Sequence, residues 1–121
     1  METMVYKNSY GWTAETTIPA PELGPNKVVK ILTMKRNNGA LTTTAQIAKI
    51  EGSFMSFKMF SDYRENLIVN KKPRVTERAV KEQQETALAM VPQTIENAKV
   101  YYAEQAAKLS AEGPFTVIAG A

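Results

Sequence analysis

Residues 27–50 read KVVKILTMKRNNGALTTTAQIAKI, and this stretch decides the fold. Two runs rich in β-branched residues flank the segment Asn37-Asn38-Gly39 at its centre. An Asn-Gly pair between two such runs is the strongest short signal of a β-hairpin, because a type I′ turn needs two residues with positive φ. The stretch predicts two antiparallel strands, over 27–36 and 41–50, joined by a tight turn.

The sequence on both sides extends this hairpin into a β-meander. Upstream, apolar and polar residues alternate over 4–18, which predicts an opening strand or a pair of short strands. Three prolines and a glycine within 19–26 predict a loop. Downstream, a turn at 51–53 is expected to lead into a third strand of the meander over 54–60. A second turn at 61–65 is expected to lead into a short fourth strand over 66–70. The expected sheet is an antiparallel meander of four to five strands.

After Lys71-Lys72-Pro73 the spacing of apolar residues changes from two to three or four, which predicts helices. Thr76 has the right side chain for an N-cap, and the first helix is expected to run to about Met90. Pro92 predicts either a kink or the first turn of a second helix, whose apolar stripe ends near Glu112.

Strands followed by helices indicate an α+β fold in which one long kinked helix, or two helices, cover one face of the sheet. A length of 121 residues fits a single domain, 1–121. Its expected parts are an N-terminal strand with a proline-rich loop (1–26), a basic meander (27–70), a helical part (74–112) and a short terminal strand or tail (115–119).

The composition excludes several classes of enzyme. The chain contains no histidine and no cysteine, so it has neither a Ser-His-Asp nor a Cys-His catalytic device, nor thiolate metal ligands. Its acidic residues form no recognisable acid–base pair. We expect no catalytic residue, no metal site and no cofactor. With no secretory signal and no apolar stretch of about 20 residues, we expect a cytoplasmic protein.

The positive charge is concentrated in the middle of the chain. The net charge is +3, but residues 27–81 hold twelve basic against four acidic residues, a net charge of +8. The flanks, 1–26 and 82–121, carry net charges of −2 and −3. Charge segregated in this way favours an anionic partner.

Two groups of residues are predicted to bind nucleic acid. The strand over 54–60 places Phe54, Lys58 and Phe60 on one face, where rings beside a cation could stack bases. The alternative is that both rings are buried, against the N-terminal strand or a dimer partner. Basic residues of the other strands and of the strand-to-helix junction are expected to hold phosphates: Lys30, Arg36, Lys49, Arg64, Lys71, Lys72, Arg74 and Arg78. Alternatively, Arg78 pairs with a glutamate on its own helix, Glu82 or Glu85.

The sequence thus predicts a non-enzymatic module that binds nucleic acid, with single-stranded DNA or RNA favoured. In element order alone, the meander and helix over 27–90 resemble the single-stranded-DNA-binding folds of the Whirly and Pur types. No diagnostic motif accompanies this resemblance, so it implies no binding residue. An alanine-rich helix around Ala98–Ala107 favours a homodimer. The alternative function is a small protein-interaction or inhibitory accessory protein, of phage or plasmid type, that binds an acidic protein partner.

Overall fold

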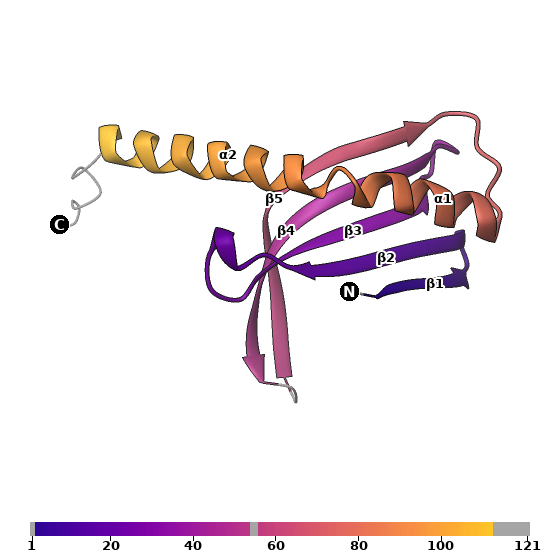
Figure 1. The fold of residues 1–121 in the computed structure, drawn as a ribbon, viewed down its shortest axis with the longest axis horizontal. Coiled ribbons are helices and arrows are strands. Elements are labelled where there is room, and N and C mark those ends of the chain that lie inside the picture. Colours follow the sequence, from indigo (N-terminus) through magenta and orange to yellow (C-terminus); the bar gives the residue numbers. More distant parts are fainter. Residues whose placement is uncertain (1, 54–55, 113–121) are drawn as a thin grey trace.

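The computed structural model describes residues 2–53 and 56–112, with side chains for 2–50 and 61–111. Within this part of the chain, five antiparallel strands form one sheet in chain order: β1 (Thr3–Asn8), β2 (Gly11–Pro19), β3 (Lys27–Lys35), β4 (Leu41–Ser53) and β5 (Ser56–Asn70). A short 3-10 helix, η1 (Pro21–Leu23), precedes β3, and α1 (Glu77–Leu88) and α2 (Val91–Glu112) follow β5. Both helices lie on one face of the sheet, and α2 continues beyond it (Figure 1). This arrangement confirms the predicted α+β fold.

The hairpin predicted at Asn37-Asn38-Gly39 is confirmed, but its turn is not of type I′. Arg36 and Ala40 close a three-residue loop, with the Arg36 N–H donating to the Ala40 carbonyl at 2.8 Å. Gly39 has a φ of +89°, whereas neither asparagine has a positive φ. One glycine in the left-handed region is sufficient for a three-residue loop, so the second residue with positive φ is not needed.

The turns predicted at 51–53 and 61–65 are wrong. The β4–β5 pairing continues from Leu41↔Asn70 to Ser53↔Ser56, so the two strands expected over 54–70 form one long strand. The register shifts between Thr43 and Thr44 and between Ile47 and Ala48. β-Bulges of this kind add a residue to one strand without ending it, which lets a polar, turn-like segment remain in the ladder.

The helical part begins and divides as the sequence predicts. The Thr76 hydroxyl caps α1 by accepting a hydrogen bond from the Ala79 N–H at 3.1 Å. The helix ends at Leu88, and Pro92 lies in the first turn of a separate second helix. Neither helix, as far as the chain is described, has the length and apolar character needed to cross a membrane. The terminal strand expected at 115–119 lies outside the described residues.

Two apolar clusters fill the space between the helices and the sheet. The larger includes Val29, Ile31 and Ile47 from the sheet, packed with Ala87 and Ala98 from the helices. The smaller is built from Ala14, Leu41 and Val80. The buried face of α1 carries Val80 of the smaller cluster, Gln84, and Ala87 of the larger cluster, in this order. A polar side chain therefore occupies the middle of the buried helix face.

Gln84 is only 1% exposed, and the sheet satisfies its amide group. Its Nε2 donates to the Thr16 hydroxyl at 2.9 Å and to the Ile31 carbonyl at 3.0 Å. Its Oε1 accepts from the Thr33 hydroxyl at 2.6 Å, and Thr33 also shares a hydrogen bond with Thr43. One amide therefore connects α1 to β2 and β3, and through Thr33 to β4.

We expect Gln84→Ala to lower the free energy of unfolding by about 2–3 kcal/mol, because it leaves buried polar partners unsatisfied and opens a cavity. Urea denaturation followed by circular dichroism measures this loss. Gln105→Ala, on the exposed part of α2, is the matched control and should change stability by less than about 0.5 kcal/mol. Equal losses in the two variants would contradict a structural role for the amide network.

Candidate nucleic-acid interface

The sheet has an open face, opposite α1 and α2, on which basic residues of β3 and β5 lie in one cross-strand row. Lys30 is paired in register with Gln46, and Gln46 with Arg64. Lys30 also forms an ion pair with Glu15, whose Oε2 lies 3.3 Å from the lysine Nζ. Its charge is therefore partly neutralised, whereas Arg64 is exposed and forms no ion pair with another described residue.

A hollow of about 330 Å³ lies on this open face, beside the β3–β4 turn. We call it the sheet-face hollow, and its lining residues are Arg36, Asn38, Thr42, Thr44, Arg64, Asn66 and Val69. Two of the arginines predicted to hold phosphates thus line the same depression. Thr42 and Thr44, between them, are 6% and 3% exposed, and Val69 is 49% exposed.

A second group of cations gathers at the end of the sheet. Lys35 is paired in register with Leu41, and Leu41 with Asn70, which places the end of β3 about 10 Å from the end of β5. Basic residues lie at the end of β3 and in the connections that follow β3 and β5. We call them the turn-end patch: Lys35, Arg36, Lys71, Lys72 and Arg74.

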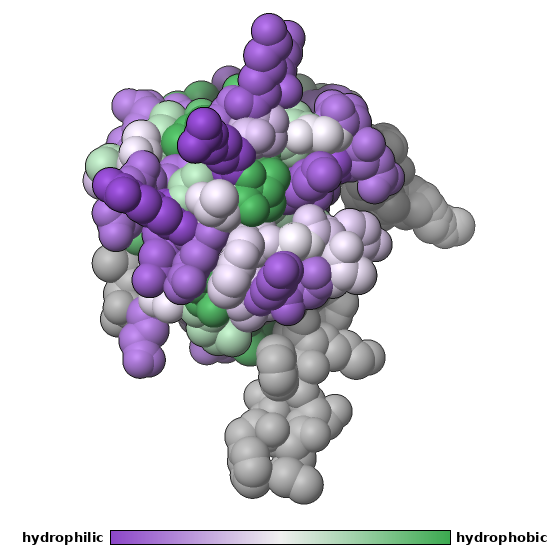
Figure 2. Space-filling view, turned by 90° about the vertical axis from the view of Figure 1, so that its right-hand side faces the viewer, coloured by the Kyte–Doolittle hydropathy of each residue, from purple (hydrophilic) through white to green (hydrophobic). Residues whose placement is uncertain are grey.

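The turn-end patch is accessible and carries little compensating charge. Four of its side chains are exposed and Arg36 is half-buried. None of the five forms an ion pair with another described residue. Figure 2 looks onto this end of the molecule, where hydrophilic side chains surround a few apolar ones. The patch and the sheet-face hollow share Arg36 and so form one continuous surface.

The aromatic residues predicted to stack bases cannot be placed in this surface. Phe54 lies outside the described residues, and so do the side chains of Lys58 and Phe60, although both belong to β5. Lys49 is half-buried on β4, in register with Lys27 and Phe60, near the start of the hairpin arm that extends past β3. Base stacking by these rings stays a prediction.

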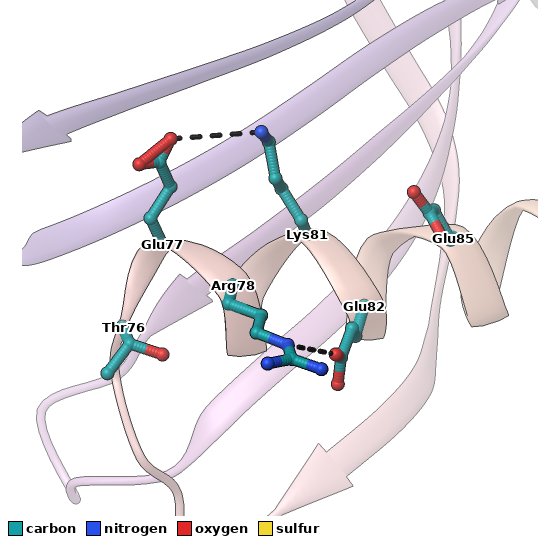
Figure 3. A pocket seen from close by; sticks show the side chains of 6 residues that line it. All are labelled: Thr76, Glu77, Arg78, Lys81, Glu82 and Glu85. Atoms are coloured by element: carbon teal, nitrogen blue, oxygen red, sulfur yellow. Dashed lines mark hydrogen bonds and ion pairs between the residues drawn. The ribbon is translucent and has the colours of Figure 1, made fainter.

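Arg78 lies in a different environment, on the exposed side of α1. A shallow hollow of about 550 Å³ is lined there by two basic and three acidic residues together with the N-cap: Arg78, Lys81, Glu77, Glu82, Glu85 and Thr76. Figure 3 shows the two cations directed to glutamates of their own helix. The Arg78 Nε lies 2.9 Å from Glu82 and the Lys81 Nζ lies 3.7 Å from Glu77. Because acidic groups outnumber basic ones, this hollow is poorly suited to an anion.

A further charged cluster joins α2 to the sheet. Lys27 forms an ion pair with Asp62 at 2.9 Å, and its Nζ lies 5.0 Å from the centre of the Tyr102 ring. Tyr102 donates a hydrogen bond to Asp62, and Tyr101 packs between Tyr102 and Tyr63.

The pKa values of this cluster indicate that it holds α2 on the sheet, as a structural anchor, and does not act as an acid–base site. Partial burial alone would raise the pKa of Asp62, but the hydrogen bond from Tyr102 and the contact with Lys27 outweigh it and lower this pKa. Burial, and then the hydrogen bond to Asp62, raise the pKa of Tyr102 well above its ordinary value. Both groups therefore keep their usual charge near neutral pH, where a general acid or base needs to exchange protons readily.

Comparisons with protein-family models, with curated proteins and with solved structures find no match. The described residues contain no group of three or more acidic side chains placed to hold a metal ion. Since a fold alone does not specify an activity, only the arrangement of side chains can indicate a function for this chain.

The sequence predicted Arg36, Lys71 and Lys72 as candidate binding residues, but it did not point to the polar residues that line the hollow with Arg36 and Arg64. Asn66 and Thr44 are in register with each other on adjacent strands. This pairing follows once residues 66–70 are laid antiparallel to 41–44, which also puts the end of β3 and Lys71 at the same end of the sheet. The lengths of the strands are consistent with this pairing, but the exact register could not be predicted because of the two register shifts between β4 and β5.

We expect Asp62→Asn to lower stability near neutral pH and to weaken its dependence on acid. Because the pKa of Asp62 is lower in the folded protein than its unfolded value of about 4, the stability it contributes is present above about pH 4 and lost as the pH falls through the folded value. Urea unfolding at about pH 6 and about pH 3 tests this. Glu96→Gln, a change in an exposed ion pair of α2, is the control. An acid dependence unchanged in Asp62→Asn would refute the anchor.

Proposed function

We propose that this protein binds single-stranded nucleic acid, with phosphates on the turn-end patch and bases on the adjoining open face. The observation that carries the proposal is that five cations, from the end of β3 and from the connections that follow β3 and β5, lie at one end of the sheet with no acidic partner among the described residues. Cations arranged in this way neutralise phosphates and release their counterions, which is the main source of affinity in sequence-independent binding.

The shape of the surface favours a single strand over a duplex. The patch continues through Arg36 into the sheet-face hollow, so a chain whose phosphates lie on Lys71 and Lys72 has a sheet surface beside it for its bases. Single-strand binders combine a basic track for the backbone with a surface that receives unpaired bases. In a duplex the bases are stacked and paired, and could not enter the hollow.

The proposal leaves two predicted residues with smaller roles. Lys30 lies on the same face, but its pairing with Glu15 reduces its attraction for phosphate. Arg78 pairs with Glu82 and adds little. An acidic protein could use the same cations, and the amide and hydroxyl groups of the hollow are what favour a nucleic acid. A non-enzymatic role and a cytoplasmic location are part of the same proposal.

We also propose that the protein acts as a homodimer through α2. The apolar stripe of this helix starts at the sheet, where Ala98 is buried, and outruns it, so that Leu109 is 65% exposed. The small side chains of Ala103, Ala106 and Ala107 and the exposed Leu109 would let a second helix pack closely, and this favours a second copy of the chain as the partner.

Binding to a single-stranded oligonucleotide should weaken steeply with salt. If all five cations of the turn-end patch contact phosphates, the slope of log K against log salt should be about −3 to −4. Fluorescence-anisotropy titrations of single- and double-stranded oligonucleotides at two or more salt concentrations measure it. Absence of binding to any oligonucleotide at low salt would overturn the proposal.

The double variant Lys71→Gln, Lys72→Gln should reduce the magnitude of this slope by about 1.4, because two phosphate contacts are removed. The matched control is Lys99→Gln, Lys108→Gln, which removes the same charge from exposed positions on α2. If both double variants bind with the same slope, the net charge of the protein and not the turn-end patch determines binding.

Leu109→Glu should shift the protein from dimer to monomer, because it places a charge in the apolar stripe where the two helices would meet. Sedimentation equilibrium at several protein concentrations measures the change. Ser110→Glu, next to it on the exposed helix, is the control for added charge. A wild-type protein that is monomeric throughout the concentration range would contradict the dimer.

A further inference from the structure

The sheet-face hollow has a chemistry different from that of the turn-end patch. The patch presents only cations, whereas the hollow places two amides, Asn38 and Asn66, and two threonines between Arg36 and Arg64. Building on the proposed function, we propose that this hollow receives one nucleobase and selects guanine. Its volume of about 330 Å³ lies at the small end of the range for pockets that hold small molecules.

The mixture of donors and acceptors indicates a base and not a phosphate. A phosphate has only acceptor oxygens, so its sites are built from donors such as arginine, lysine and backbone N–H groups. The amide of Asn66 offers both a donor and an acceptor, and it forms no hydrogen bond with another described residue. A group with mixed polarity, wide enough to reach across adjacent strands, matches the edge of a base.

The arginines favour guanine among the bases. Guanine O6 and N7 are both acceptors, and a bidentate arginine on this pair is the commonest specific contact in nucleic-acid recognition. Arg36 and Arg64 have no ion pair within the described residues, so their guanidinium groups are available for such a contact. The donors on the opposite edge of guanine can meet the Asn66 amide oxygen or the threonine hydroxyls, since the Asn38 Oδ1 already accepts from the Ala40 N–H at 3.0 Å. The exposed Val69 at the rim offers apolar contact.

The test compares two single-stranded DNAs of about 12 nucleotides, within the usual site size of single-strand binders. One contains only thymine and the other alternates thymine with guanine. In anisotropy titrations at one salt concentration, the guanine-containing strand should bind about tenfold more tightly. Equal affinities would overturn the selection of guanine and leave the proposed function standing, whereas no binding to either strand at low salt would overturn both.

Two variants locate the preference. Arg64→Lys keeps the charge but loses the fork of donors, so it should abolish most of the guanine preference while leaving the salt dependence unchanged. Asn66→Ala should weaken the preference in the same way. Arg74→Lys makes the same change on the turn-end patch, outside the hollow, and should retain the preference. A preference that survives both hollow variants would show that guanine is read elsewhere and overturn the assignment.

Discussion

The arrangement of this molecule depends on one buried amide. Gln84 places the middle of α1 over β2 and β3 through three hydrogen bonds, and the Thr33–Thr43 contact extends this constraint to β4. Apolar contacts alone tolerate sliding and repacking, whereas a buried polar group that is satisfied in one position favours one arrangement. Because only residues 71–76 connect β5 to α1, fixing the helix also fixes the connection that carries Lys71, Lys72 and Arg74.

Strand pairing, together with this constraint on α1, turns a charge pattern along the chain into a charge pattern in space. Basic residues of the meander end beside the β5–α1 connection because β3, β4 and β5 are antiparallel neighbours. The acidic residues of the following segment point elsewhere: Glu77 and Glu82 neutralise cations of their own helix, and Glu96 pairs with Lys99 on α2. Ion pairs within one helix thus leave the turn-end patch uncompensated.

The fold could be predicted largely from local signals, and the failures have specific causes. Gly39 and Thr76 act through their own backbone and side-chain chemistry, so the hairpin and the helix start are visible in the sequence. The bulges of β5 depend on how its residues face β4, which no local pattern reveals. Gln84 was missed because a polar residue within an apolar stripe has meaning only beside Thr16 and Thr33, which are distant in sequence. The cations of the site could be named in advance, whereas their convergence required the register.

The stability of the fold does not explain the turn-end patch. Its lysines are exposed, lie at a strand end or in a connection, and belong to neither of the two apolar clusters. Like charges held near one another repel, and this repulsion opposes folding, most strongly at low salt. A cluster that the core does not need, and that slightly opposes folding, supports the proposed binding of an anion. The adjoining hollow adds hydrogen-bonding groups of both kinds, which a diffuse counterion does not require and a nucleotide does.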